Sequence, residues 1–244
     1  MNDVFTAIAL NVPLTWLDLT AVLLFVALWF GYGWYADYSV TPQPHLGAEL
    51  ARYTRDWFAR MIERENRMVD VNILRILSRS SQFFASTTML LLGALVALMG
   101  YTETAAKLVA ELPFAQQVVT QRLWEIKILL LLIIFVYAFF KFSWSIRQFG
   151  FASLLVGAAA RGPSDPALHG AHIERLSIVT GFANRNFNQG LRAYYFGVAA
   201  LSWFLHPLLM IAVTLAVVYV LHTREFRSRT LDVLREGQGL ETRG

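Results

Sequence analysis

The chain has 244 residues, of which 56% are hydrophobic and only 16% charged, and its mean hydropathy is +0.47. Soluble domains carry about 25% charged residues, so the composition excludes an ordinary soluble domain and indicates an integral membrane protein. The net charge of +4 fits basic residues that flank membrane spans and face anionic lipid headgroups, and we predict no nucleic-acid partner. The absence of Cys excludes disulfides, thiolate nucleophiles and Cys-ligated metals.

The first predicted span covers about residues 16–35. Thr15 precedes the first turn of this span and Asp18 lies within it. The two residues match a variant of the capping box, in which Asp18 is the acidic N3 residue. The alternative is an intramembrane carboxylate with a functional role. No Lys or Arg precedes this apolar run and no small-residue cleavage site follows it, so we expect the span to remain in the mature protein.

A first amphipathic cytoplasmic segment is predicted over about residues 47–79, after Pro42 and Pro44, which stop any helix. Asp56–Arg60 and Glu63–Arg67 are acid-first pairs at i,i+4 spacing, and apolar residues recur every three or four positions. This pattern is typical of a helix on the membrane surface or packed against a neighbour. A basic patch for nucleic acid or a soluble anion is the alternative.

The second and third predicted spans cover about residues 82–101 and 124–142. The second begins with a group of hydroxyl side chains, which fit helix packing or the lining of a polar pathway: Ser80, Ser81, Ser86, Thr87 and Thr88. The uncharged part of the third, Ile128–Phe140, has only 13 residues. We therefore expect Lys127 and Lys141 to snorkel toward opposite headgroup layers.

The second cytoplasmic helical segment is predicted over about residues 145–192. Asp165, His169 and His172 recur at i, i+4 and i+7, a spacing that allows a metal with nitrogen and oxygen ligands. Asp165 also reads as a helix N-cap before Pro166. The two histidines are weak metal candidates, and we predict neither a metal nor a cofactor.

The fourth predicted span, about residues 194–221, lies in a 29-residue run without a formal charge, Ala193–Leu221. At 100° per residue, the helix has a polar stripe and an opposite stripe of small residues that allows another helix to approach closely. The polar stripe, with Ser86 and Thr87, is a predicted polar pathway: Asn188, Arg192, Tyr195, Ser202 and His206. The helix-packing face is Gly190, Ala193, Gly197 and Ala200.

The sequence thus predicts an all-α polytopic membrane protein, a single domain over residues 1–244. Its architecture is a four-helix transmembrane bundle with amphipathic cytoplasmic helices. With the N-terminus outside, 13 Lys and Arg fall on the cytoplasmic side and 8 outside, five of these in the C-terminal tail. The tail conflicts with this orientation, and Pro207 is expected to bend the fourth span.

Three strings carry a resemblance to a known family: Phe83–Thr88, Ala138–Trp144 with Arg147 and Gln148, and Asn188–Tyr195. The chain resembles the integral membrane family called domain of unknown function 599, found in bacteria and plants, over about residues 15–230. The resemblance implies a multi-span protein of the bacterial inner membrane with no assigned activity and no catalytic residues to transfer.

The predicted function is a homo-oligomeric pore or transporter for an ion or small solute. In this hypothesis Arg192 attracts an anion and His206 gates or relays a proton. Alternatively, His206 is a buried neutral imidazole bonded to Ser202 or to a carbonyl freed by Pro207. The other function considered is an accessory or assembly subunit of a larger membrane complex. No catalytic constellation occurs, so an enzyme is not predicted.

Overall fold

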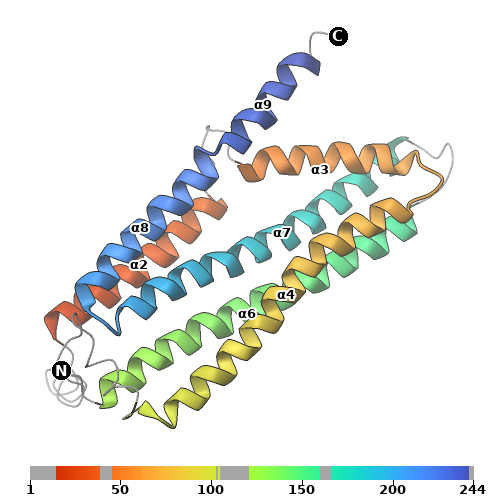
Figure 1. Cartoon of the computed structure of the whole chain (residues 1–244). Helices are drawn as coiled ribbons and strands as arrows, with labels where there is room; N and C mark the ends of the chain where they lie inside the picture. The colour runs from red at the N-terminus through yellow and green to blue at the C-terminus, as the bar shows by residue number, and fades with distance from the viewer. Residues whose placement is uncertain (1–14, 39–45, 103, 105–120, 160–165, 242–244) are drawn as a thin grey trace, which may run out of the picture. The chain divides into compact units, whose positions relative to one another are not determined.

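A computed structural model describes residues 15–38, 46–102, 104, 121–159 and 166–241. The described residues form helices and no strands, which confirms the all-α class (Figure 1). The helices are α2 (Trp16–Tyr38), α3 (Leu46–Ile62), α4 (Met68–Met99), α6 (Gln121–Ala158), α7 (Pro166–Ser202), α8 (Pro207–Phe226) and α9 (Arg229–Glu241).

Four helical stretches are long and apolar enough to cross a membrane: Trp16–Asp37, Met68–Met99, Gln121–Ala158 and Pro207–Arg235. This finding confirms a multi-pass membrane protein with four candidate spans. The first and third contain the spans predicted at about 16–35 and 124–142, and the second overlaps the span predicted at about 82–101 and ends at Met99. Several of these helices are far longer than a bilayer requires. The 38 residues of α6 measure about 57 Å, against a hydrocarbon core of roughly 30 Å.

The single span predicted over 194–221 is wrong, because the chain breaks at residues 203–206. Helix α7 ends at Ser202, where the amides of Trp203 and Phe204 bond to carbonyls three residues back. Helix α8 then begins at Pro207, whose missing N–H is no loss at the first position of a helix. Pro207 therefore starts a new helix rather than bending an existing one, and a short turn joins α7 to α8 (Figure 1).

The cytoplasmic segments predicted at about 47–79 and 145–192 are also divided differently. Helix α3 ends at Ile62, and α4 runs unbroken from Met68 into the second candidate span. Glu63 and Arg67 lie between these helices, so the predicted i,i+4 helical pair does not form. Helix α6 likewise continues from the third candidate span to Ala158, and α7 begins at Pro166.

The chain divides into two compact units. Unit 1 consists of Met1–Tyr35, Thr87–Ala138 and Leu191–Tyr219, and unit 2 of Ala36–Ser86, Phe139–Gly190 and Val220–Gly244. Helices α4, α6 and α7 each contribute residues to both units.

The core of unit 1 is dominated by aromatic contacts between α2 and the last turns of α7. Phe25 and Phe196 are fully buried, with ring centroids 5.7 Å apart in an edge-on arrangement. Trp29 contacts both rings, with centroids 5.8 Å from Phe25 and 6.1 Å from Phe196. Because these rings fill the interior of unit 1, α7 is a packed member of the bundle although its composition is more polar than that of the four candidate spans.

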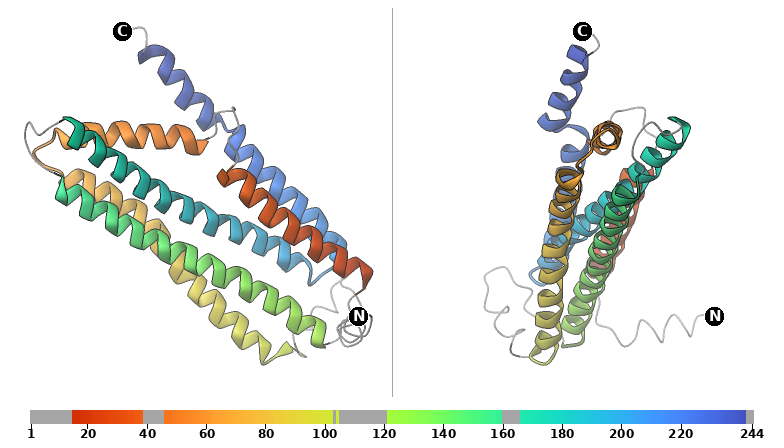
Figure 2. Two further views of the ribbon diagram at one scale, coloured as in Figure 1. Left: turned by 180° about the vertical axis from the view of Figure 1, so that it is seen from behind. Right: turned by 90° about the vertical axis from the view of Figure 1, so that its right-hand side faces the viewer.

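The core of unit 2 is made where α3 packs on the parts of α4, α6 and α7 that belong to this unit. Its buried members are Phe58, Met61, Ile62, Leu74, Phe149, Ala152, Val156, Leu176 and Ala183. The apolar face of α3 is therefore covered by protein over its last turns, whereas Leu50 near its start is exposed. Helices α4 and α6 run side by side in unit 2 in both views of Figure 2. The hydroxyl groups of Ser81 and Ser145 form a hydrogen bond between these two helices.

Candidate functional site

The start of α2 has the capping geometry that its sequence predicts. The Asp18 amide donates to Thr15 Oγ1 at 3.2 Å, and the Thr15 amide donates to Asp18 Oδ2 at 3.1 Å. The Thr15 hydroxyl donates to the same carboxylate oxygen at 2.6 Å. This reciprocal pair confirms the capping box and leaves Asp18 Oδ1 free to bind another group.

Trp203 is that group. Its indole N–H donates to Asp18 Oδ1 at 2.8 Å. Asp18 and Trp203 have exposed fractions of 0% and 1%, so this bond between α2 and the α7–α8 turn is closed to solvent within unit 1. Asp18 is thus both a helix cap and a tertiary contact.

Lys127 binds the same tryptophan from α6. Its ammonium donates to the Trp203 carbonyl oxygen at 2.8 Å and lies 5.2 Å from the centroid of the Trp203 ring. That carbonyl lies just beyond the end of α7, where a helix leaves acceptors without intrahelical partners. Lys127 is only 1% exposed, so the prediction that it snorkels to a headgroup layer is wrong.

The Asp18–Lys127–Trp203 cluster therefore holds two opposite charges inside unit 1. Asp18 and Lys127 form no direct ion pair among the described residues; each binds a different group of Trp203. A buried charge is costly unless other groups bind it. The cluster can hold the α7–α8 turn in place, and a mobile ion that binds either charged group would compete with Trp203 for it.

Two members of the predicted polar stripe make local bonds at the ends of α7 and α8. Ser202 donates to the Ala199 carbonyl of its own helix at 2.7 Å. His206 caps α8, because its Nδ1 accepts from the Leu208 amide at 3.1 Å and its carbonyl accepts from the Met210 amide. The others are divided by exposure: Asn188 and Ser86 are exposed, and Arg192, Tyr195 and Thr87 are half-buried.

Neighbours of the predicted stripe make interhelical polar contacts. In unit 1, the hydroxyls of Tyr194 and Thr88 are 2.7 Å apart, joining α7 to α4. In unit 2, Gln189 donates to Asp37 Oδ2 at 2.7 Å, joining α7 to α2. A shift of one residue on a helix changes the direction of the side chain by 100°, so Tyr194 and Gln189 point to other sides of α7 than the predicted stripe.

The predicted helix-packing face is buried, and its two glycines lie against α6. In unit 2, a Cβ built on Gly190 would lie 2.6 Å from Phe142 Cε1. In unit 1, a Cβ on Gly197 would lie 3.1 Å from Phe135 Cζ, and Ala193 and Ala200 are buried. The small residues therefore allow close packing within one chain. They do not supply a surface for a partner subunit, which was one motive for the accessory-subunit hypothesis.

Hydroxyl and amide side chains also join the helices within unit 2. Ser145 of α6 donates to the Ala183 carbonyl of α7 at 2.8 Å and lies 3.0 Å from the Ser81 hydroxyl of α4. Asn186 donates to Gln148 Oε1 at 2.8 Å. For Ser81, the helix-packing interpretation of the hydroxyl-rich segment matches these bonds.

A second buried carboxylate lies in unit 2 at the start of α4. Asp70 is 0% exposed, and its Oδ1 accepts from Trp57 Nε1 and from Arg64 Nη1, both at 2.7 Å. The salt bridge with Arg64 links the start of the α3–α4 connection to the first turn of α4. An acidic residue in that turn also interacts favourably with the helix dipole. Asp70 thus fixes the angle at which α3 leaves α4.

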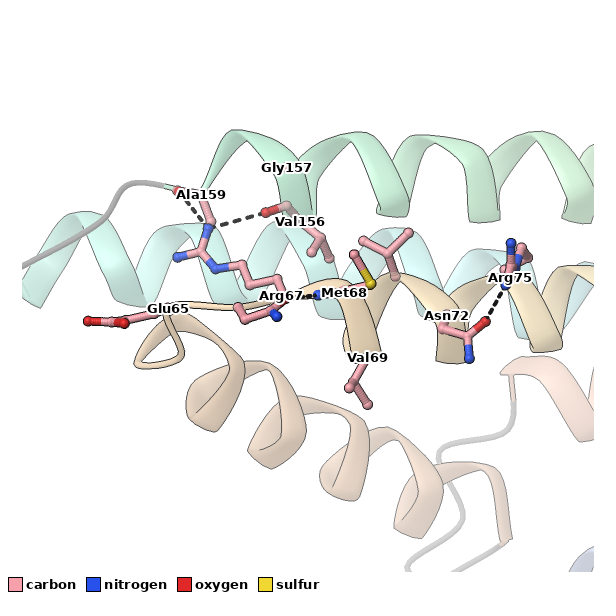
Figure 3. A pocket seen from close by; sticks show the side chains of 11 residues that line it. Glu65, Arg67, Met68, Val69, Asn72, Arg75, Val156, Gly157 and Ala159 are labelled. Carbon is pink, nitrogen blue, oxygen red and sulfur yellow. Dashed lines mark hydrogen bonds between the residues drawn. The ribbon is translucent and has the colours of Figure 1, made fainter.

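A groove of about 960 Å³ lies beside this connection, between the start of α4 and the end of α6 (Figure 3). Arg67 crosses it, donating to the carbonyl oxygens of Ala159 at 2.6 Å and Val156 at 3.3 Å. These carbonyls belong to the last turn of α6, which lacks intrahelical donors. At the other end of the groove, Arg75 donates to Asn72 Oδ1 at 2.7 Å.

The weak metal candidates do not form a site in the part of the chain that is described, where no group of three metal-binding side chains occurs. His172 Nε2 lies 2.9 Å from the Leu155 carbonyl oxygen, which makes it a contact between α7 and α6 within unit 2. His169 Nε2 is buried and has no hydrogen-bond partner among the described residues. Asp165, the third member of the proposed spacing, lies outside the described residues.

Lys127 and Trp203 are the members of the cluster whose roles sequence reasoning missed. A lysine at the edge of an apolar run fits snorkelling as well as burial, and a tryptophan in such a run fits a lipid-facing position. The signal that was available is Lys127 itself, because an ionisable residue in a short span indicates a functional or structural site by default.

A family model described as "Protein of unknown function, DUF599" matches residues 20–230, which is most of the chain and confirms the resemblance. No curated protein and no solved structure matches the chain.

Proposed function

Since the chain belongs to the DUF599 family, whose function is unknown, we propose from its own geometry that it transports an ion or a small solute across the cell membrane. The observation that supports this proposal is the Asp18–Lys127–Trp203 cluster, in which two buried opposite charges are joined through one tryptophan. Membrane proteins keep such costly residues mainly where ions or protons are handled.

The transport step that we propose is a competition for the cluster. An ion that reaches Asp18 displaces the Trp203 indole N–H, and an ion of opposite sign that reaches Lys127 displaces the Trp203 carbonyl. Either exchange releases the turn between α7 and α8, which is otherwise held from α2 and α6. Because aromatic rings fill the interior of unit 1, we place the path between copies of a homo-oligomer.

We expect neutralisation of the cluster to reduce transport. In proteoliposomes, Asp18→Asn and Lys127→Met should each lower the flux of the transported ion by about tenfold or more. A loss of this size corresponds to a free-energy change within about 1–3 kcal/mol, the usual range of coupling free energies between sites. Proton, K⁺ and Cl⁻ fluxes are measured separately with a pH dye, a potential-sensitive dye and a halide-quenched dye. Ser202→Ala is the matched control, because its hydroxyl bonds only to the Ala199 carbonyl of its own helix in the described structure.

Two results would contradict the transport proposal. One is a wild-type protein whose three fluxes all equal those of protein-free liposomes. The other is a folded, monodisperse Asp18→Asn, Lys127→Met double variant with wild-type flux.

We further propose that the N-terminus is outside the cell and that the C-terminus and the basic ends of the unit 2 helices are on the cytoplasmic side. The sequence ranges of unit 2 contain 17 of the 21 Lys and Arg, and those of unit 1 contain four: Lys107, Arg122, Lys127 and Arg192. Cytoplasmic segments are enriched in Lys and Arg. With α7 as an additional crossing, the basic C-terminal tail after α8 lies on the same side of the membrane as α3. The conflict between the basic tail and an outside N-terminus, which arose for a single fourth span, then disappears.

Labelling of single cysteines tests this orientation, because the native chain has no Cys. Gln121→Cys in unit 1 and Thr230→Cys in unit 2 are both at exposed positions. On intact cells, a membrane-impermeant maleimide should label the first variant and should label the second only after the membrane is opened. The reverse pattern would reject the orientation, and labelling of both variants on intact cells would place both sites outside.

A further inference from the structure

Within unit 2, one surface of α4 is apolar and yet exposed. Val69, Ile73, Ile76 and Phe83 recur at i, i+4, i+7 and i+14, so they share one side of the helix. Each is exposed, Val69 by 64% and Phe83 by 66%. The buried side of α4 in the same unit consists of Asp70, Leu74, Ser78, Ser81 and Ala85. We name the exposed side, with Asn72, Arg75 and Arg79, the outer face of α4.

All formal charge on the outer face of α4 is positive. Arg75 and Arg79 are exposed there. The helix contains one acidic residue, Asp70, which is fully buried and paired with Arg64. Arg75 is held by its bond to Asn72 at the rim of the groove beside α6. An occupant of this face therefore needs apolar surface together with negative charge.

The position of the arginines along α4 matches the depth of lipid headgroups. The helix continues unbroken from Met68 to Met99, and residues 80–99 contain no charge. These 20 residues measure about 30 Å, the thickness of the hydrocarbon core. Arg79 and Arg75 then lie about 2 Å and 8 Å beyond its edge, within reach of a headgroup layer that is about 5–7 Å thick.

We propose that the outer face of α4 binds anionic phospholipid, with the phosphate on Arg75 and Arg79 and the upper acyl chains on Phe83, the apolar side chain of this face that lies within the hydrocarbon core. A phospholipid has both properties that the face requires, an apolar body and a negative head, and basic side chains at the cytoplasmic end of a span select anionic lipids. This surface is independent of the Asp18–Lys127–Trp203 cluster, so lipid binding stands whether or not the protein transports a solute.

Lipid selectivity of the purified full-length protein tests the proposal. Native mass spectrometry compares retention of phosphatidylglycerol and phosphatidylcholine supplied in equal amounts. We expect the wild type to prefer phosphatidylglycerol, Arg75→Gln to reduce this preference about fivefold, and Arg75→Gln, Arg79→Gln together to reduce it about 30-fold. Arg60→Gln, an equal charge change at an exposed position of α3, should leave the preference unchanged.

The paired variant Arg75→Lys, Arg79→Lys keeps the charge and should keep most of the preference, which separates charge from local folding. Equal retention of both lipids by the wild type, or an unchanged preference in the double Gln variant, would overturn the proposal. A further experiment oxidises the Ile76→Cys variant in membranes. A disulfide-linked dimer would mean that a second copy of the chain, and not lipid, covers the outer face of α4. An excess of inorganic phosphate should not displace the bound lipid, because it has no apolar part.

Discussion

Replacing Gly190 with valine should destabilise the protein by about 3 kcal/mol or more, the upper part of the range for overpacked cores. A Cβ at this position would lie 2.6 Å from Cε1 and 2.7 Å from Cζ of Phe142. The Phe142 ring is buried and cannot retreat easily, because it stacks on Phe84 with centroids 5.3 Å apart and contacts Phe187 at 5.8 Å. The measurement is the midpoint of thermal unfolding in detergent.

Gly181→Ala is the matched control on the same helix. Nothing lies within 4 Å of a Cβ built there, and alanine favours a helix over glycine by up to about 1 kcal/mol. We therefore expect this variant to be as stable as the wild type or slightly more stable. If Gly190→Val and Gly181→Ala unfolded at the same temperature, the close packing of α7 on α6 in unit 2 would be refuted.

Trp203→Ala should cost about 3–5 kcal/mol, the range for removing a buried aromatic side chain. Trp203 is among the largest fully buried side chains, and its loss also removes the donor to Asp18 Oδ1. Thermal unfolding in detergent measures the total effect. Trp34→Ala serves as the control, since Trp34 is 68% exposed and substitutions at such positions usually change stability by about 0.5 kcal/mol or less.

Trp203→Phe separates the two parts of this effect. Phenylalanine keeps most of the ring but has no N–H, so the buried carboxylate of Asp18 loses its partner from the α7–α8 turn. Leaving such an acceptor unsatisfied costs about 1–3 kcal/mol, or more for a charged group. A Phe variant as stable as the wild type would show that the bond to Asp18 contributes nothing, and would remove the structural basis of the proposed transport step.

Sequence alone predicted most of the fold where one local signal had one meaning. Thr15 and Asp18 predicted the start of α2 because reciprocal capping requires only residues three positions apart. Apolar runs located three of the candidate spans, because a helix that crosses hydrocarbon excludes charge over most of its length. The small face of α7 was also recognised, and only its partner, α6, had to come from the structure.

The errors arose where one signal fits two structures. Pro207 is equally consistent with a bend inside a helix and with the first residue of a new one. The second applies because His206 provides an N-cap, a role that histidine seldom has. Lys127 was expected at a headgroup layer because its partner, the Trp203 carbonyl, is a backbone group 76 residues away that no side-chain pattern reveals. The Asp18–Lys127–Trp203 cluster therefore could not be assembled from the sequence.

The polar character of α7 has a consequence for biogenesis. Helix α7 contains Arg185, Asn186 and Arg192 and is not among the stretches apolar enough to cross a membrane. A translocon scores each helix by its own partitioning into lipid, and arginine near the centre of a helix costs about 2.5–3.5 kcal/mol there. We therefore expect α7 to wait at the translocon until α8 emerges after the four-residue turn. The two helices then enter the lipid as a hairpin, with the earlier helices already inserted to receive them.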